Sequence, residues 1–430
     1  MSHDLHAAST CAYPGIYIGC MSGTSLDGVD LAAVQIDADW TCILLSFRCE
    51  QYTASERVML RSAFGCTDAS SAQAAAAEAV LHQRHASGIA ALLADLEMPA
   101  VAVQCVVLHG QTVHHSPATG VTVQLGDGQR LADQLGLPVL VHARVRDVQL
   151  GGQGAPLAPV FHHAMLRARQ AAAPEAGPIP AADVVLNVGG VSNITVCPAA
   201  AAVVRERSPE EELSSMLACD CGPGNALLDD AMLGWTGQQY DAGGSVAASG
   251  KACTEAVEQF LQHPYFEKPA PKSLDRQELA QAAVCALERA GLVHADAAGV
   301  SLGGAHPVAL SAPLNEVIAT LTAFTAQSIL RGIAACAEQA SVAVRAVYVA
   351  GGGVHNSALM QALRHGMPGV TWSPVDELGW APDVVESACF ALIGARVRQG
   401  LPTSWPGTTG VPDPCCGGQI LQPRSGIAGI

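Results

Sequence analysis

Residues 19–32 read GCMSGTSLDGVDLA and place hydroxyl groups, glycines and one carboxylate in the turn between two apolar runs. A plain β-hairpin needs only two to five turn residues, so this longer turn indicates a binding loop. Its backbone N–H groups and the hydroxyls of Thr24 and Ser25 can donate to phosphate oxygens. Asp27 can position Mg²⁺ through the water shell that this ion keeps in phosphate sites. The alternative is an ordinary capped turn, in which Asp27 bonds its own backbone.

Three further glycine-rich turns follow strand-like segments. DVVLNVGGVSNITVCP (183–198) repeats the strand–turn–strand pattern of the opening hairpin. CDCGPGNALLDDAML (219–233) and AVYVAGGGVHNSALMQAL (346–363) each lead into a helix, and Asn356 is the expected cap of the second one. Glycine turns at helix N-termini offer N–H groups and the positive end of the helix dipole to an anion. The sequence has neither a P-loop nor a GxGxxG dinucleotide motif, so these turns predict a phosphate held by backbone amides and a divalent cation.

Asp220 lies between a strand end and a Gly-Pro-Gly turn, where its carboxylate can act as a general base or cap the helix that begins near Asn225. The histidines of HGQTVHH (109–115) and the cysteines of CDC (219–221) lack the spacing and partners of a zinc site. We interpret the first of these segments as polar side chains on a loop after a strand. Arg146, Asp147 and Gln153 lie beside tight turns in RDVQLGGQG, a mixture that suits a hydroxyl-rich ligand such as a sugar.

Composition limits the class of protein. The 430 residues are 50% hydrophobic and 14% charged, and 38 acidic against 22 basic side chains give a net charge of −16. These values favour a folded chain of several domains and argue against nucleic acid or an anionic membrane as a partner. The N-terminus has no signal-peptide pattern, and no stretch reaches the roughly 20 apolar residues of a membrane span. We therefore expect a cytoplasmic protein with reduced cysteines.

Strand-like and helix-like segments alternate along the chain, which predicts an α/β fold. The pattern predicts strands at 14–20, 29–36, 102–110 and 137–145, and a helix at 71–96. Residues 170–182 are rich in proline and alanine and are the expected linker, and 198–215 is an expected surface insertion. The apolar helix at 319–336 is expected to bury against its own sheet or against a second subunit.

Together these motifs resemble the anhydro-N-acetylmuramic acid kinase family. Ten segments occur in the family's order between about residues 16 and 411: MSGTSLDGVD, HGQT, RDVQLGGQGAPLAPVFH, NVGGVSNIT, DCGPGNALLDD, YDAGGSVAASG, PKSLDRQEL, TLTAFTAQSI, VAGGGVHNSALM and VESACFALIGARVRQGLP. The family belongs to the actin, hexokinase and heat-shock chaperone superfamily of ATPases. The resemblance implies two ribonuclease H-like lobes with an ATP cleft between them. Lobe I would comprise 13–181 plus about 385–430, and lobe II 182–384.

The resemblance also implies an activity. The enzyme would open the 1,6-anhydro ring of anhydro-N-acetylmuramic acid with water and phosphorylate O6 from ATP, as a cytoplasmic homodimer in peptidoglycan recycling. Asp220 corresponds to the catalytic base, and Asp27 would lie near Mg²⁺. The residues implied to bind ATP are Gly23, Thr24, Ser25, Leu26, Asp27, Gly28, Val29, Asp30, Gly189, Gly190, Asn193, Gly222, Gly224, Asn225, Gly351, Gly352, Gly353 and Asn356. The residues implied to bind the sugar are Gln111, Thr112, Arg144 or Arg146, and Glu386.

The sequence departs from the family pattern at three places. His142 and Ala143 replace the first two residues of a usual DFR, so that a carboxylate is missing before Arg144. Cys221 replaces a threonine, and Ser404 replaces an asparagine. The change at His142 leaves open a kinase of another hydroxylated substrate. A non-catalytic ATP-binding protein on the same scaffold is the third interpretation.

Overall fold

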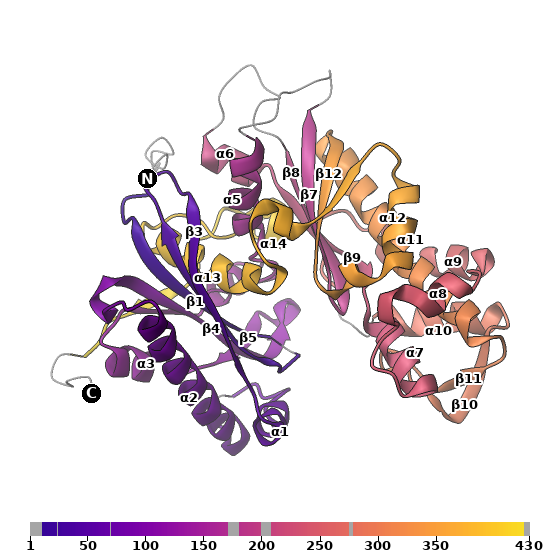
Figure 1. Cartoon of the computed structure of the whole chain (residues 1–430), viewed down its shortest axis with the longest axis horizontal. Coiled ribbons are helices and arrows are strands. Elements are labelled where there is room, and N and C mark those ends of the chain that lie inside the picture. The colour runs from indigo at the N-terminus through magenta and orange to yellow at the C-terminus, as the bar shows by residue number, and fades with distance from the viewer. Residues whose placement is uncertain are drawn as a thin grey trace. The chain divides into compact units, whose positions relative to one another are not determined.

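The computed structural model describes residues 11–23, 25–68, 70–170, 180–198, 208–274 and 278–424. The chain divides into two compact units (Figure 1). Unit 1 comprises residues 1–173, 205–214 and 380–430, and unit 2 comprises residues 174–204 and 215–379. The described residues 208–214, which the sequence assigned to lobe II, therefore belong to unit 1.

Unit 1 is built on a mixed sheet with the strand order β14-β6-β4-β1-β2-β3, and β5 pairs with β4. The first three strands form an antiparallel meander, and β4 and β6 run parallel to β1. The strands are β1 (Gly15–Ser22), β2 (Gly28–Ile36), β3 (Cys42–Gln51), β4 (Val103–Ser116), β5 (Val121–Leu125), β6 (Val139–Val141) and β14 (Gln419–Leu421).

The long helices of unit 1 pack on this sheet. Helix α13 (Val385–Arg398) contacts β1, β2 and β4, and α2 (Ala72–Asp95) contacts β2 and β3. Helix α13 approaches β1 so closely that a Cβ atom on Gly19 would lie 1.8 Å from the carbonyl oxygen of Ser387, so only glycine fits there. The other helices are α1 (Ala54–Ser62), α3 (Gly128–Leu135), α4 (Val145–Gln149), α5 (Pro159–Gln170), α6 (Pro209–Ser214) and α14 (Pro406–Thr409).

Unit 2 repeats the same topology. Its main sheet has the order β13-β12-β7-β8-β9, with an antiparallel meander β7-β8-β9 and with β12 and β13 parallel to β7. The strands are β7 (Ala181–Val188), β8 (Val191–Pro198), β9 (Leu217–Pro223), β12 (Ala343–Ala350) and β13 (Thr371–Pro374). In chain order, β7, β8, β9, β12 and β13 take the places that β1, β2, β3, β4 and β6 take in unit 1. The predicted α/β fold of two like, ribonuclease H-type lobes is thereby confirmed.

Helix α11 (Leu314–Ala340) is the central helix of unit 2. It packs on β8 and β9 and against the neighbouring helices. By length and composition α11 could cross a membrane, but 78% of its apolar window is buried within the protein. Because the helix packs on β8 and β9 of its own sheet, the first of the two predictions for 319–336 is confirmed. The remaining elements are α7 (Ala226–Thr236), α8 (Ser245–Ser249), α9 (Thr254–Leu261), α10 (Ala280–Arg289), α12 (Ser357–Gly366) and a two-stranded sheet of β10 (Val293–Val300) and β11 (Val308–Leu310).

Two predicted strands have wrong boundaries. The strand predicted at 137–145 ends at Val141, because His142 adopts a left-handed conformation with φ 58° and helix α4 follows. The strand predicted at 102–110 does not end in a loop, since β4 continues to Ser116 and pairs with β5. The HGQT segment therefore lies in a strand. The predicted helix at 71–96 is confirmed as α2. Residues 171–179 of the predicted linker and 199–207 of the predicted insertion lie outside the described residues, and the described part of the insertion contains helix α6.

Candidate active site

The opening hairpin of unit 1 exposes the side chains that the sequence singled out. Ser25 and Asp27 are exposed, whereas Leu26 between them is fully buried in a left-handed conformation with φ 59°. The N–H of Leu26 donates to the carbonyl of Gly23 (3.2 Å), and the carbonyl of Asp27 accepts from the N–H of Tyr52 (3.0 Å). Leu26 and Tyr52 thus hold the turn from within the core. Thr24 lies outside the described residues.

The carboxylate of Asp27 makes no hydrogen bond or ion pair within the described part of the chain, which does not fit the capped-turn alternative. Asp30 lies nearby, and burial, together with the charges of Asp383 and Asp27, raises the pKa of its carboxyl. Among the described residues no group of three or more potential ligand side chains could hold a metal ion. This arrangement fits Mg²⁺ bound mainly by phosphate and water, with one carboxylate nearby, better than a closed protein cage.

A buried chain of hydrogen bonds lies behind the hairpin. Ser22 donates to Oε1 of Gln111 (2.6 Å), and its Oγ lies 2.8 Å from the Tyr52 hydroxyl. Because the one Ser22 proton is given to Gln111, the Tyr52 hydroxyl must be the donor in the second bond. All three side chains are at most 3% exposed. Gln111 therefore supports the hairpin in this structure, and Thr112 accepts from Gln124 (3.3 Å) on β5.

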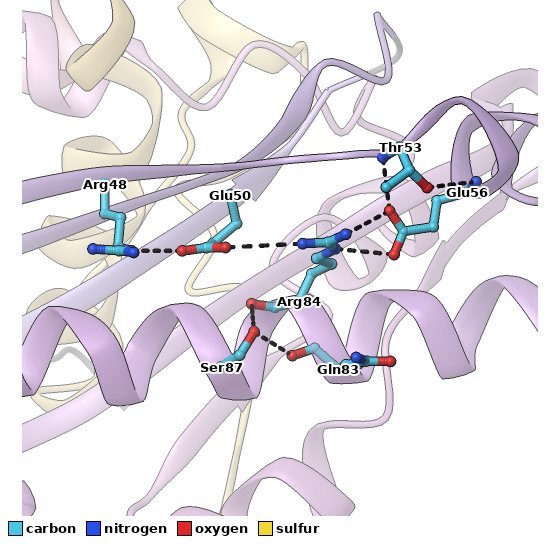
Figure 2. Close-up of polar contacts among 7 residues, drawn as sticks. All are labelled: Arg48, Glu50, Thr53, Glu56, Gln83, Arg84 and Ser87. Carbon is cyan, nitrogen blue, oxygen red and sulfur yellow. Dashed lines mark hydrogen bonds and ion pairs between the residues drawn. The ribbon is translucent and has the colours of Figure 1, made fainter.

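A network of charged side chains fixes the segment that carries Tyr52 (Figure 2). Arg84 of α2 forms two hydrogen bonds with Glu56 (3.0 and 2.7 Å) and lies 4.0 Å from Glu50 of β3. Glu56 also accepts from the N–H of Thr53 (2.7 Å), while the Thr53 hydroxyl accepts from the N–H of Glu56. This capping box starts α1. The network thereby joins the end of β3, the start of α1 and the middle of α2.

Arg144 is held at two points of its guanidinium group. Its Nε donates to Nε2 of His109 (2.9 Å), and its Nη1 donates to the carbonyl of Gly154 (2.8 Å). Burial lowers the pKa of Arg144. The negative charge of Glu386, in the first turn of α13, opposes this lowering. The Glu386 side chain keeps contact with solvent, yet desolvation raises the pKa of its carboxyl and the Arg144 charge opposes that rise.

Arg146 lies apart from this group. It is exposed and lines an open surface depression together with His142, Gln149 and Gln419. Of the two arginines that the sequence left open, the structure therefore brings Arg144, and not Arg146, to Glu386.

In unit 2 the three glycine turns meet at one end of the sheet. The hairpin turn Gly189–Gly190 joins β7 and β8, and its two carbonyls accept the N–H groups of Asn225 (2.7 Å) and Gly224 (3.0 Å). The side chain of Asn225 donates to the carbonyl of Val188 (3.1 Å). A Cβ on Gly351, which has φ 79°, would lie 2.6 Å from that same carbonyl oxygen. Glycine at 351 is thus required by close packing on β7 as well as by its conformation.

The helices at these turns differ in part from the expectation of free N–H groups. At the start of α7 the N–H groups of Gly224, Asn225 and Ala226 donate to the Gly189–Gly190 carbonyls, so they are already bonded. At α12, Asn356 caps the helix as predicted by accepting the N–H of Leu359 (3.0 Å).

Asp220 lies on β9, beside these turns. Asn193 of β8 is its cross-strand partner, and Asn187 of β7 is the partner of Asn193, so the three side chains share one face of the sheet. The Asp220 carboxylate accepts one hydrogen bond from the N–H of Leu274 (2.7 Å) and does not cap α7. Burial raises the pKa of Asp220 to about 6, and this hydrogen bond lowers it. A carboxylate of this kind is ionised at neutral pH and basic enough to accept a proton.

The backbone around Asp220 is held on both sides. Its N–H donates to the carbonyl of Lys272 (2.9 Å), and its carbonyl accepts from the hydroxyl of Tyr265 (2.7 Å). The ammonium group of Lys272 lies 4.7 Å from the centroid of the Tyr265 ring, a cation–π contact. These contacts fix the position of Asp220 without neutralising its carboxylate.

The chain is similar to known proteins over nearly its whole length. The family model described as "Anhydro-N-acetylmuramic acid kinase" matches residues 15–423. The chain belongs to the anhydro-N-acetylmuramic acid kinase family. The curated anhydro-N-acetylmuramic acid kinases of Rhodopseudomonas palustris (strain ATCC BAA-98 / CGA009) and Azorhizobium caulinodans are each 38% identical to it, over 412 and 414 residues, covering 94% of this chain and 99% of each relative.

The kinase of Gluconobacter oxydans (strain 621H) is 37% identical over 409 residues, with the same coverage. A solved structure titled "Activator of the 2-Hydroxyisocaproyl-CoA Dehydratase from Clostridium difficile with bound ADPNP" matches 90% of this chain and 97% of its own at 11% identity. Its TM-score of 0.38 is too low to bear on the fold.

The three departures from the family pattern lie in different surroundings. His142 faces the depression beside Arg146. Cys221 is buried against α11, where a Cβ on Gly332 would lie 2.6 Å from its Sγ, so its side chain points to the face of the sheet opposite to that of Asp220. Ser404 donates to Oδ2 of Asp147 (2.5 Å), a buried carboxylate that also accepts from Thr409 and from the N–H of Gly154.

Several residues of the site were missed by the sequence analysis. Ser22 and Tyr52 support the hairpin, His109 holds Arg144, and Asn187 lies on the face of Asp220. Ser22 directly precedes Gly23, and Asn187 lies two residues before Gly189, so proximity to a glycine turn is a local signal that could have identified both. Tyr52 and His109 act through residues distant in sequence, and although His109 lies in the HGQT segment, no local pattern marks its contact with Arg144.

Proposed function

We propose that this protein is an ATP-dependent kinase that hydrolytically opens 1,6-anhydro-N-acetylmuramic acid and phosphorylates O6, giving N-acetylmuramic acid 6-phosphate in peptidoglycan recycling. The observation that carries the proposal is Asp220, whose pKa is raised to about 6 beside the glycine turns of unit 2. A phosphoryl transfer by itself needs positioning and charge neutralisation. A water that attacks a sugar carbon, in contrast, needs a base.

The reaction assigned to Asp220 is a coupled one. Its carboxylate takes a proton from water while the water oxygen bonds to the anomeric carbon. The bond between that carbon and O6 breaks, and O6 accepts the γ-phosphoryl group of ATP while ADP leaves. The proton taken by Asp220 passes to solvent in the next step, so the residue is ready for another turnover.

ATP contacts are assigned to the turns of both units. In unit 1 they are Gly23, Ser25, Leu26, Gly28, Val29 and Asp30, with Thr24; in unit 2 they are Gly189, Gly190, Asn193, Gly222, Gly224, Asn225, Gly351, Gly352, Gly353 and Asn356. The exposure of Ser25 and Asp27 and the gathering of three glycine turns support this assignment. Mg²⁺ beside Asp27 would neutralise phosphate charge.

Sugar contacts are assigned to Arg144, Glu386 and Thr112, with Gln111 acting from behind the hairpin. Arg144 and Glu386 carry opposite charges that influence each other, which suits a ligand with both hydrogen-bond donors and acceptors. Arg146, the second arginine of the sequence analysis, is assigned no sugar contact here because it faces the surface depression. His142 lies there too, so the missing carboxylate gives little support to a different substrate.

The resemblance to the family supports a cytoplasmic homodimer. Val58 on α1 is 68% exposed, and Met59 and Phe64 beside it are partly exposed; these apolar side chains are a candidate contact. Sedimentation analysis of the purified protein at several concentrations tests the dimer, since a single species with the mass of one chain would contradict it.

The activity is tested by incubating the protein with ATP, Mg²⁺ and the anhydro sugar in ¹⁸O-water and weighing the product. We expect a sugar phosphate that carries one solvent oxygen, and none with Asp220→Asn. A phosphorylated sugar without solvent oxygen would mean simple transfer to a hydroxyl. ATP binding without turnover on this sugar would contradict the proposal and favour another substrate or a non-catalytic protein.

A further inference from the structure

His109 lies in β4, is 5% exposed, and has a defined arrangement of its two ring nitrogens. Nε2 lies 2.9 Å from Nε of Arg144, and Nδ1 lies 2.8 Å from the carbonyl oxygen of Gly110. A guanidinium group can only donate, so Nε2 must accept. A carbonyl can only accept, so Nδ1 must carry the proton. The contacts therefore fix one neutral tautomer of the ring.

The same surroundings keep His109 uncharged. Burial, followed by the positive charge of Arg144, lowers its pKa well below the ordinary value for histidine. The ring also packs on Phe390 of α13, with 4.8 Å between the centroids. His109 is therefore a fixed hydrogen-bond acceptor over the working pH range, and it is not a proton carrier.

The second anchor of Arg144 is equally well supported. The carbonyl of Gly154 accepts from Nη1, and Gly154 adopts φ 67°. Its N–H donates to Oδ1 of the buried Asp147 (2.7 Å), whose Oδ2 is held by Ser404 and Thr409. Nη2 of Arg144, in contrast, has no hydrogen-bond partner in the described part of the chain. Two anchors thus set the plane of the guanidinium group and leave one nitrogen for a ligand.

We propose that His109 is a positioning residue for the sugar site: it orients Arg144 so that the unbonded part of the guanidinium group meets the substrate. The inference rests on the proposed function, because it takes Arg144 as a sugar contact. His109 itself touches neither substrate nor ATP in this assignment. Its removal should therefore weaken sugar binding and leave ATP binding unchanged.

The test compares His109→Phe, His109→Gln and Arg144→Met in the full chain by steady-state kinetics. Phenylalanine keeps the ring on Phe390 but removes the acceptor, whereas the glutamine amide oxygen can replace Nε2. We expect KM for the anhydro sugar to rise about 10-fold or more in His109→Phe and in Arg144→Met, the loss typical of a hydrogen bond to a charged group. KM for ATP should stay within about twofold, and His109→Gln should recover most of the loss.

The outcomes separate the two proposals. If Arg144→Met leaves the sugar KM unchanged, Arg144 is no sugar contact and both assignments fall. If Arg144→Met raises it but His109→Phe does not, only the role of His109 is overturned.

A measurement on the unaltered protein needs a variant only to assign one signal. ¹⁵N NMR of histidine-labelled protein, with the signal assigned by its loss in His109→Gln, should show the Nδ1–H tautomer at pH 7 and no protonation at pH 5. An Nε2–H tautomer could not accept from Arg144, and would overturn the inference.

Discussion

Within the described residues, the carboxylate of Asp220 accepts one hydrogen bond, from the backbone N–H of Leu274 at 2.7 Å. Leu274 is 54 residues further along the chain and follows Lys272, whose carbonyl accepts the N–H of Asp220. One N–H donor is not enough to offset the desolvation of the carboxylate, so its pKa stays raised. The segment around Leu274 thus holds Asp220 in place and leaves it basic.

The first prediction concerns the pH dependence of activity. Because the base must be ionised in the free enzyme, kcat/KM for the sugar should rise with pH below about 6 and level off above it. On the acid side the slope should approach tenfold per pH unit. Initial rates from pH 4.5 to 8.5 in buffers of constant ionic strength test this. A profile that is flat down to pH 4.5 would exclude Asp220 as the base.

The second prediction concerns stability. The pKa of Asp220 in the folded state is above that of an unfolded chain, so the ionised carboxylate costs the folded state free energy at pH above 6. Asp220→Asn should therefore raise the free energy of unfolding by about 1–3 kcal/mol at pH 8, since each tenfold change in acidity is worth about 1.4 kcal/mol. At pH values below the ordinary pKa of aspartate both states are protonated, and the gain should vanish. Urea unfolding at pH 8 and at a pH below the ordinary pKa of aspartate measures the stability gain of Asp220→Asn under each condition. A gain that is equally large at the low pH would contradict its assignment to the ionised carboxylate.

The third prediction concerns the packing next to Asp220. A Cβ on Gly222 would lie 2.6 Å from Cβ of Ser328 on α11, and 2.8 Å from its Oγ. Gly222→Ala should therefore push β9 away from α11, lower kcat and cost about 1–3 kcal/mol of stability. The double variant Gly222→Ala with Ser328→Gly restores the space, at about 1 kcal/mol for a glycine inside a helix. Recovery of kcat in the double variant is the decisive result; equal loss in both would refute the steric account.

The fourth prediction concerns the buried ion pair between Arg396 and Glu210. Both side chains are about 4–5% exposed, and Nη2 of Arg396 lies 2.8 and 2.9 Å from the two carboxylate oxygens. The guanidinium group also lies about 5.5 Å from the rings of Trp40 and Trp405. Arg396→Met leaves Glu210 buried without a partner and should cost about 3–5 kcal/mol.

The control for this pair is the double variant Arg396→Met with Glu210→Leu. It removes both charges, so it should recover most of the lost stability. Denaturant unfolding of the single and double variants measures the coupling. A double variant as unstable as Arg396→Met alone would mean that Arg396 acts through its packing on the tryptophans.

The fifth prediction uses two arginines of the network in Figure 2. Arg84 makes two hydrogen bonds to Glu56 and its side chain is 24% exposed, whereas the side chain of Arg48 is 39% exposed and pairs with Glu50 and Asp95. Arg84→Met should cost about 1 kcal/mol, because two parallel bonds hold the charge pair in one geometry. Arg48→Met should have no measurable effect. A larger loss for Arg48→Met, in thermal unfolding of the two variants side by side, would contradict this order.

Local patterns predicted much of the fold. The alternation of strands and helices, the glycine turns and the cap at Asn356 depend on neighbours in sequence, and the structure contains them. The end of the strand at Val141 was missed, because the left-handed conformation of His142 is unusual for a residue other than glycine.

Contacts between distant residues could not be predicted in the same way. The sequence could not show that Arg144 rather than Arg146 contacts His109, because His109 lies 35 residues before Arg144. It treated the histidines of HGQTVHH only as zinc ligands or loop side chains. The packing of α6 with unit 1 depends on Glu210 and Arg396, which are 186 residues apart.

The chain passes between the two units four times, because residues 205–214 belong to unit 1 while the stretches on both sides of them belong to unit 2. Neither unit is therefore encoded by one uninterrupted stretch of the gene. A recombinant that takes the whole interval between 182 and 379 from a relative would pair Arg396 with the relative's residue at position 210. Exchanges between members of this family should succeed more often when 205–214 comes from the same parent as 380–430, even though nearly two hundred codons separate Glu210 from Arg396.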